Sequence, residues 1–310
     1  MSFCFAASRR RTLAAAVLAA ALLGCGGGEP IERFVARRLI VLGDEFSVLE
    51  AGGIKYSVNA LTNGVPDCAA NPLWVQIVAN AYGLMFANCP NPTGNVTALN
   101  FAAAGAKVSD IPAQIDAVGG FVEKDLVTLL AGANDIYEQY ALVAANAQTA
   151  QAAIGAATNL GVSLAGQVNR IADSGGKVLI STLPDLGATP FALAPDAPPG
   201  RAALLTQMTQ AFNSKVLSNI TNDGRRIGLL LTEDLFRSIV RTGGAGTGLN
   251  VKDAACDVTK APVVTQCTTD KLVTGATAGA YLWADDRWFS FGGHAQLANL
   301  ALVRALSNPF

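Results

Sequence analysis

Residues 38–49, RLIVLGDEFSVL, decide the fold of this chain. Four consecutive apolar residues, 39–42, predict a strand buried on both faces, as in a parallel sheet. Gly43 and Asp44 interrupt this run and predict a loop at its end. In open α/β sheets, ligands and catalytic groups gather at the carboxyl ends of strands. The residues that follow Gly43 are therefore the first place to look for a functional site.

Segments with strand and helix patterns alternate along the rest of the chain. The predicted strands are residues 39–42, 97–101, 126–130, 177–182 and 227–231. The predicted helices are 71–82, one that begins at 109–112, an alanine-rich stretch at 136–172 with a break near Gly161, 201–220 and 292–306. Residues 50–70 and 188–200 are expected to be loops, and 242–279 an irregular insertion. This order predicts a three-layer α/β/α sandwich with a five-stranded parallel sheet of the flavodoxin type.

The first 24 residues have the pattern of a secretion signal. Three arginines at positions 9–11 precede an apolar run, 12–24, that is too short for a mature membrane span. The run ends in LLGC at 22–25, which resembles the lipobox of bacterial lipoproteins. That resemblance implies cleavage before Cys25 and a lipid anchor on it, and Gly26 after the cysteine favours the outer membrane of a Gram-negative bacterium. Export by the general secretory route is expected, although residues 8–10 also resemble part of a twin-arginine signal.

The net charge and the cysteine content restrict the partners and the metal sites that this protein can have. Loss of the leader's three arginines changes the formal net charge from −1 to −4, so nothing indicates a nucleic-acid partner. After removal of Cys4 and lipidation of Cys25, four cysteines remain in an oxidising compartment. Of the three possible pairings, Cys68–Cys89 with Cys256–Cys267 is favoured, because each pair closes a loop within one segment. A zinc site is disfavoured by the single histidine and the lack of a close Cys-x-x-Cys pair.

The apolar strand followed by Gly-Asp-x-x-Ser resembles the first motif block of the GDSL (SGNH) hydrolases, mostly esterases and lipases. In that family the residue after Gly-Asp is the nucleophilic serine, and here Glu45 occupies the position. Gly105, in NFAAAGAKV, resembles the second-block glycine, whose backbone N–H donates to the oxyanion. Asn134, in LLAGANDI, resembles the third-block asparagine, whose side-chain amide donates to the same oxygen. The resemblance implies the SGNH hydrolase fold.

The last block of the family places an aspartate three residues before the catalytic histidine. In YLWADDRWFSFGGHAQLA, residues 281–298, Asp285 falls on the aspartate and Trp288 on the histidine. Tryptophan has no basic nitrogen, so the nucleophile and the base are both substituted. His294 resembles a second, auxiliary histidine, and we expect it to be a packing or helix-terminal residue, since Phe291 stands three positions before it.

Two residues of the first block need an interpretation. We expect the Glu45 carboxylate to occupy the oxyanion hole as an internal anion, held by the Asn134 amide and the Gly105 N–H. Ser47 is the candidate substitute nucleophile, although a shift of two residues would move it away from the oxyanion donors. A sharper alternative is an acid–base pair of Glu45 and Asp285 with glycosidase-type chemistry.

Four aromatic residues near the last block have two interpretations. They either pack against the final helix or form a platform for a sugar or an acyl chain. They are Trp283, Trp288, Phe289 and Phe291.

The sequence therefore predicts a leader at 1–24, a tether at 25–37 and an SGNH/GDSL hydrolase-like domain at 38–310, lipid-anchored in the cell envelope. No cofactor or metal is expected, and the protein is expected to be a monomer. By family the function would be ester hydrolysis, and the alternative is an inactive relative, a pseudoenzyme, that binds an acyl or glycan ligand in the cleft. An ester, acyl or glycan molecule is the expected small-molecule partner.

Overall fold

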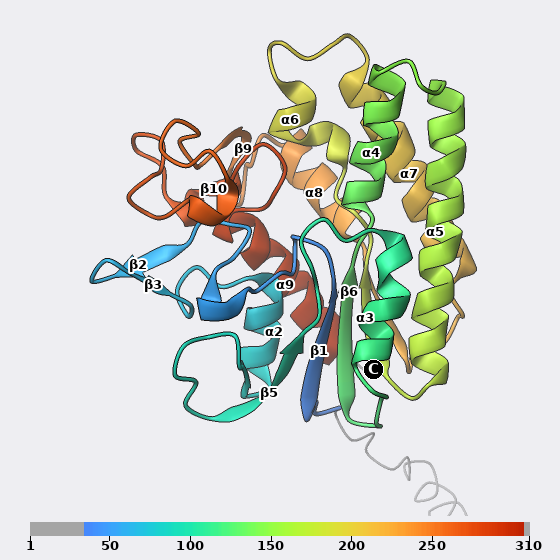
Figure 1. Ribbon diagram of the computed structural model, residues 1–310, viewed down its shortest axis with the longest axis vertical. Helices are drawn as coiled ribbons and strands as arrows, with labels where there is room; N and C mark the ends of the chain where they lie inside the picture. The colour runs from blue at the N-terminus through green and yellow to red at the C-terminus, as the bar shows by residue number, and fades with distance from the viewer. Residues whose placement is uncertain (1–33, 307–310) are drawn as a thin grey trace, which may run out of the picture. The chain divides into compact units, whose positions relative to one another are not determined.

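Strand β1 (Arg38–Gly43) lies at the centre of a parallel sheet (Figure 1). The computed structural model describes residues 34–306, which belong to one compact unit. Residues 39–42 have no exposed surface, which confirms the doubly buried strand predicted from the apolar run. β1 pairs in parallel with β5 on one side and with β6 on the other.

The sheet has six strands in the order β4-β5-β1-β6-β7-β8, and each pairing is parallel. Its other strands are β4 (Leu84–Phe86), β5 (Asn95–Asn100), β6 (Asp125–Leu130), β7 (Lys177–Ser181) and β8 (Ile227–Leu230). The three-layer α/β/α class is confirmed, but the predicted number of five strands is wrong. The additional strand, β4, is three residues long and lies at the edge of the sheet. A strand this short shows no periodicity in the sequence.

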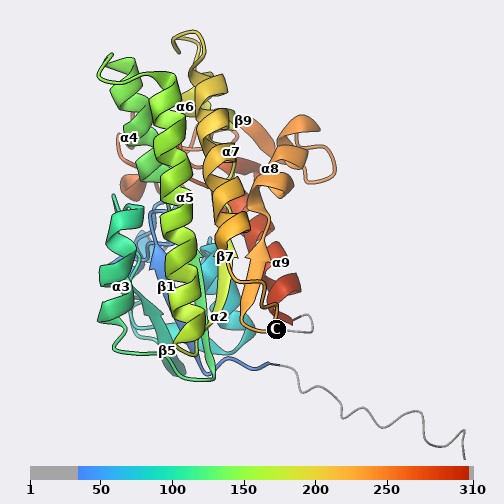
Figure 2. The same cartoon turned by 90° about the vertical axis from the view of Figure 1, so that its right-hand side faces the viewer.

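Helices cover both faces of the sheet. Figures 1 and 2 show α2 and α9 on one face and α3, α5 and α7 on the other. The helices are α2 (Trp74–Ala81), α3 (Ile111–Ala117), α4 (Ala133–Ala144), α5 (Ala150–Asp173), α6 (Pro190–Leu193), α7 (Arg201–Asn219), α8 (Thr232–Arg241) and α9 (Phe291–Leu306). The short α6 lies in the stretch expected to be a loop, and α8 was not anticipated.

The alanine-rich stretch forms two helices, but the break is not near Gly161. The chain turns between α4 and α5, where Asn146 adopts a left-handed φ of 54° and the Thr149 side chain caps α5 by accepting the Ala152 N–H. Gly161 lies inside α5, where a Cβ atom would come within 2.3 Å of the Phe212 carbonyl oxygen of α7. This glycine therefore permits close helix packing.

Two disulfide-bonded segments extend from the sheet. The Cys68–Cys89 and Cys256–Cys267 bonds are both present, which confirms the favoured pairing. Residues 50–70 contain a 3-10 turn and the hairpin β2 (Ala60–Thr62) and β3 (Val65–Asp67). The segment 242–279, expected to be irregular, contributes β9 (Asn250–Ala254), which pairs with β10 (Tyr281–Trp283).

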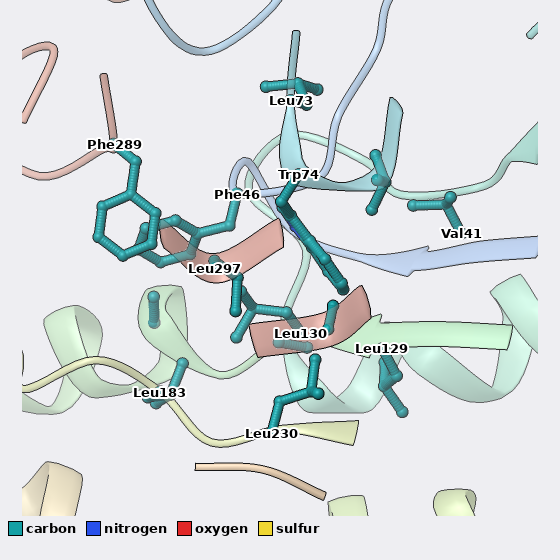
Figure 3. Packing of buried hydrophobic residues seen from close by; sticks show 14 of the residues in the cluster. Val41, Phe46, Leu73, Trp74, Leu129, Leu130, Leu183, Leu230, Phe289 and Leu297 are labelled. Atoms are coloured by element: carbon teal, nitrogen blue, oxygen red, sulfur yellow. The ribbon is translucent and has the colours of Figure 1, made fainter. Parts of the chain in front are cut away.

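Aromatic residues close the core at the carboxyl end of β1. Phe46, directly after the β1 turn, has no exposed surface, and its ring centroid lies 4.7 Å from that of Phe289 (Figure 3). Phe289 also packs against Phe236 of α8 and Trp283 of β10. The turn after β1 is therefore held against the last block of the chain.

The expected leader, the lipidation residue Cys25 and the tether up to residue 33 lie outside the described residues. Within residues 34–306, no helix is both long and apolar enough to cross a membrane.

Candidate active site

Gly43 sets the geometry of the turn after β1. Its φ is 133°, and a Cβ atom there would lie 2.0 Å from the carbonyl oxygen of Leu130 on β6. The side chain of Gln114 on α3 holds the same residue: its Oε1 accepts the Gly43 N–H at 2.8 Å and its Nε2 donates to the Gly43 carbonyl at 2.9 Å. Because the turn is fixed in this way, Glu45 projects from a defined position at the carboxyl edge of the sheet.

The Glu45 carboxylate accepts hydrogen bonds on both oxygens. The Gly105 N–H donates to Oε1 at 2.7 Å, and the Asn134 side-chain amide donates to Oε2 at 2.7 Å. Glu45 is buried, with 7% of its surface exposed. The expected contact between this carboxylate and the two donors is thus present in the structure, whereas the oxyanion-hole role of the donors stays a prediction.

Three loops supply these groups. Glu45 follows β1, Gly105 follows β5, and Asn134 lies in the first turn of α4, after β6. The strand order places β1 between β5 and β6, so the three loops meet at one edge of the sheet. Asn134 also donates to the Ala106 carbonyl at 3.0 Å, which joins its amide to the loop that carries Gly105.

Two further carboxyl groups lie beside Glu45. Asp44 is fully buried, and its burial, together with the charge of Glu45, raises its pKa well above the usual range. Asp135 accepts the Val108 N–H at 2.9 Å, and burial raises its pKa to about 6. Both residues tie the loops of the site to one another, and neither has a cation as its main partner.

The last block brings Asp285 and Trp288 to the same region. Asp285 Oδ1 accepts the backbone N–H groups of Arg287 at 2.9 Å and Trp288 at 2.7 Å. Burial raises the pKa of Asp285 to about 6. The Trp288 ring packs edge-on against Phe46, with centroids 4.9 Å apart. Trp288 therefore lies beside the residue that follows Glu45, but its indole cannot take a proton from a nucleophile.

Ser47 is placed in the core. It has no exposed surface, and its Oγ accepts the Trp74 indole N–H at 3.1 Å. Its backbone carbonyl accepts the Asn100 side-chain amide at 2.7 Å. A hydroxyl buried and bonded in this way has no access to a substrate carbonyl, so the geometry argues against Ser47 as a substitute nucleophile.

His294 is a buried packing residue, as expected. It has no exposed surface, its ring lies 5.8 Å from that of Phe289, and the Trp74 backbone N–H points to its Nδ1 at 3.5 Å. Burial, with a smaller contribution from the charge of Lys55, lowers its pKa to about 3. An imidazole that stays neutral over the whole physiological range and has no exposure does not serve as a general base for the cleft.

Some aromatic residues of the last block lie in the core, and one lines a cavity beside the site. Trp283 and Phe289 are buried and pack against each other, with centroids 5.3 Å apart, which supports the packing interpretation. Phe291 is half-buried at the start of α9. Trp288 also lines a cavity.

Two hollows adjoin the site. We call the first the outer groove: it has a volume of about 760 Å³ and is lined by Gly105 and Asn134 together with Tyr137, Tyr140 and Phe191. We call the second the Trp288 pocket: it has a volume of about 570 Å³ and is lined by Trp288, Asp285 and Tyr56 and by the segment that contains Cys256. Arg287 lines both hollows.

Sequence reasoning missed two contributors to these walls. The first is Arg287, whose guanidinium lies 4.8 Å from the Tyr137 ring centroid and 4.5 Å from that of Phe191. Tyr56, on the loop after β1, lines the Trp288 pocket. Neither arginine–aromatic stacking nor the direction of a loop leaves a motif, so only the fold reveals these residues.

No group of three or more histidine, cysteine, aspartate or glutamate residues in the described part of the chain is arranged to hold a metal ion. All four cysteines within 34–306 form disulfide bonds, so no thiolate ligand is available there.

The site can be compared with known proteins. The model of the GDSL-like lipase/acylhydrolase family matches residues 40–227, a segment that contains Glu45, Gly105 and Asn134. Asp285 and Trp288 lie beyond the matched residues. Comparison with curated protein sequences gives no significant match.

Solved structures with similarity to this chain include an acetylxylan esterase from Geobacillus stearothermophilus. The two are 13% identical over 90% of this chain and 98% of that one, with a TM-score of 0.47. A member of the lipolytic G-D-S-L family from Veillonella parvula is 12% identical over 86% of this chain and 96% of that one, with a TM-score of 0.41. Because the family model matches more than half of this chain, the chain belongs to the GDSL-like lipase/acylhydrolase family.

Proposed function

We propose that this protein is a catalytically inactive member of its family that binds an ester, acyl or glycan ligand in the cleft without hydrolysing it. The observation that carries the proposal is the pair of hydrogen bonds from Gly105 and Asn134 to Glu45. A serine esterase needs these donors free for the oxygen that becomes negative in the transition state. Here a carboxylate of the same chain already occupies both of them.

Three further features support the absence of serine chemistry. Glu45 cannot act as the serine would, because its acyl intermediate would be an anhydride instead of an ester. Trp288 provides no base beside it, and His294 is buried. Ser47 is bonded to Trp74 inside the core. Glu45, Ser47, Asp285, Trp288 and His294 therefore form no nucleophile–base pair among themselves.

The binding part of the proposal rests on the outer groove. Its aromatic side chains, Tyr137, Tyr140 and Phe191, and its volume of about 760 Å³ suit an acyl chain or a sugar ring. Charged side chains in its lining, Lys107, Glu138 and Arg287, can orient the ligand.

We also propose that the protein is an exported lipoprotein of the cell envelope, anchored through Cys25 in the outer membrane. The support is the LLGC sequence at 22–25 after a basic and apolar leader. Radiolabelled palmitate should be incorporated by the natural chain and not by Cys25→Ala, and equal labelling of the two would contradict the anchor.

The proposed function is tested by measuring turnover and binding on the same protein. Hydrolysis of p-nitrophenyl acetate should not exceed the buffer rate, and Ser47→Ala should leave this result unchanged. A longer-chain p-nitrophenyl ester should raise the melting temperature of the natural protein. Phe191→Ala should abolish that increase, whereas Leu193→Ala, at an exposed position of α6 outside the groove lining, should preserve it. Serine-dependent turnover would overturn the proposal, as would the absence of stabilisation by any ester of the series.

A further inference from the structure

The Trp288 pocket has two chemically different sides. One is the segment closed by the Cys256–Cys267 disulfide, which supplies apolar side chains: Ala261 and Val264 are buried, and Val258 and Val263 remain 70% and 51% exposed at its rim. The other side carries Asp285 and Asp286 next to the Trp288 ring. A cavity of about 570 Å³ thus combines apolar surface, aromatic rings and carboxylates.

The lining of this pocket holds two carboxylates, Asp285 and Asp286, and one guanidinium, Arg287, so it carries an excess of negative charge. Asp285 is stabilised by two backbone N–H groups on one oxygen, yet burial and the neighbouring Asp286 still raise its pKa. Tyr56, which also lines the pocket, donates to the Glu50 carboxylate at 3.2 Å; burial raises its pKa, and the charges of Glu50 and Glu45 add to that rise. The local field is therefore negative.

Arg287, the one basic residue of the lining, is directed toward the other hollow. Its guanidinium packs on the rings of Tyr137 and Phe191, which line the outer groove and not the Trp288 pocket. Its Nε lies 3.8 Å from Asp286 Oδ1, which makes an ion pair that is too long for a hydrogen bond. Lys260, in the adjacent loop, pairs with Asp257 at 3.1 Å. Lys260 is not part of the lining, so the pocket keeps one carboxylate more than it has cations.

An apolar pocket with aromatic rings and an excess of carboxylates over cations is suited to one class of ligand. A substituted ammonium group carries a positive charge that is weakly hydrated, so it gains from both aromatic rings and carboxylates. An acyl chain would fill the apolar part but would leave the excess negative charge of the lining without a partner. We propose that the Trp288 pocket binds the N-methylated ammonium group of the ligand.

This inference rests on the proposed function, because it names a chemical feature of the ligand held in the same cleft. Trp288 lines the pocket and packs on Phe46, directly after Glu45, so a bound ammonium group would lie beside the Glu45 turn. The group could belong to a small solute or to a lipid head group, and both share the same chemistry.

The test compares choline with dimethylbutanol, the uncharged analogue in which a carbon atom replaces the nitrogen. Titration calorimetry on the purified full chain should show choline binding about tenfold tighter than the analogue. Asp285→Asn and Asp286→Asn should each weaken choline binding several-fold and leave the analogue unaffected. Asn at position 285 can still accept the two backbone N–H groups, so the turn is kept while the charge is removed. Asp234→Asn, an exposed carboxylate on α8 outside the pocket lining, is the matched control and should change neither ligand.

Vesicles distinguish the two sources of the group. Co-sedimentation with phosphatidylcholine vesicles but not with phosphatidylglycerol vesicles, in a form that choline competes away, identifies a lipid head group. Choline binding without vesicle binding identifies a small solute, and both results support the inference. Equal affinity for choline and dimethylbutanol would overturn it, as would no binding of either.

The two proposals fail separately. Serine-dependent turnover would overturn the proposed function whatever choline does. A protein without turnover that is stabilised by esters but does not discriminate choline from dimethylbutanol would overturn only the ammonium inference.

Discussion

Asn134 donates its side-chain amide to Oε2 of Glu45 at 2.7 Å, and this hydrogen bond joins the carboxyl ends of β1 and β6. The Gly105 N–H completes the arrangement on the other oxygen. The two donors that the family resemblance assigns to an oxyanion hole therefore hold a carboxylate that belongs to the chain itself. Glu45 becomes part of the structure of the cleft.

Glu45→Ala should lower the free energy of unfolding by about 1–3 kcal/mol, because two buried donors lose a charged acceptor. Urea denaturation measures this change, and Glu123→Ala, at an exposed position, should alter it by less than about 0.5 kcal/mol. Formate should raise the melting temperature of Glu45→Ala and not of the natural protein, since it can occupy the vacated donors. A variant as stable as the natural protein and insensitive to formate would show that the carboxylate contributes nothing there.

Gly43→Ala should destabilise the fold by more than about 3 kcal/mol, because the new Cβ would meet the Leu130 carbonyl and the backbone has a φ of 133°. Gly119→Ala is the matched control. Its φ is also positive, at 75°, but a Cβ there would contact nothing, so about 1 kcal/mol is expected. Similar losses in urea denaturation for the two variants would mean that the close approach of β1 and β6 is not what requires Gly43.

His294 should make the protein less stable as the pH falls. The pKa of its imidazole is about 3 in the folded chain and about 6.5 in the unfolded chain. As the pH falls between these values, the unfolded state binds a proton that the folded state does not, and the free energy of unfolding decreases. The contribution of neutral His294 is fully present above about pH 6.5 and is lost toward pH 3, by up to about 1.4 kcal/mol per pH unit. Asp135 and Asp285, whose pKa values are raised, act in the opposite direction.

A variant separates these effects. The difference in unfolding free energy between the natural protein and His294→Asn should shrink as the pH is lowered from 6 to 4. Because the chain has one histidine, its NMR signal can be followed directly and should not titrate above pH 4. A midpoint near pH 6 would contradict the buried, neutral imidazole.

Much of the fold could be predicted because its signals are local. The apolar run at 39–42 and the glycine after it determine both β1 and the start of the site turn. Strand β4 and helix α8 escaped prediction for different reasons: β4 is three residues long, and α8 begins directly after β8 without a connecting loop. The role of Gly161 depends on the Phe212 backbone of another helix, which no local pattern indicates.

The contact of Glu45 with Gly105 and Asn134 could be anticipated because motif order along parallel strands places all three at one edge.

Lys55 shows what could not be anticipated. It is fully buried, and its ammonium donates to the carbonyls of Cys68, Ala70 and Asn71 at 2.6–3.2 Å. Burial lowers its pKa to about 8. A lysine held only by backbone oxygens from a distant turn has no signature in the sequence.

Restoring the two substituted positions tests the central claim most directly. Hydrolysis of p-nitrophenyl acetate is measured for the natural protein, Glu45→Ser, Trp288→His and the double variant, with thermal unfolding to verify that each is folded. If Glu45 fills an intact oxyanion hole and the base is missing, the first three should not exceed the buffer rate. The double variant should exceed Glu45→Ser about a hundredfold and lose that gain with Asn134→Ala. Turnover by the natural protein that Ser47→Ala abolishes, or a folded double variant whose activity is indifferent to Asn134→Ala, would contradict the account.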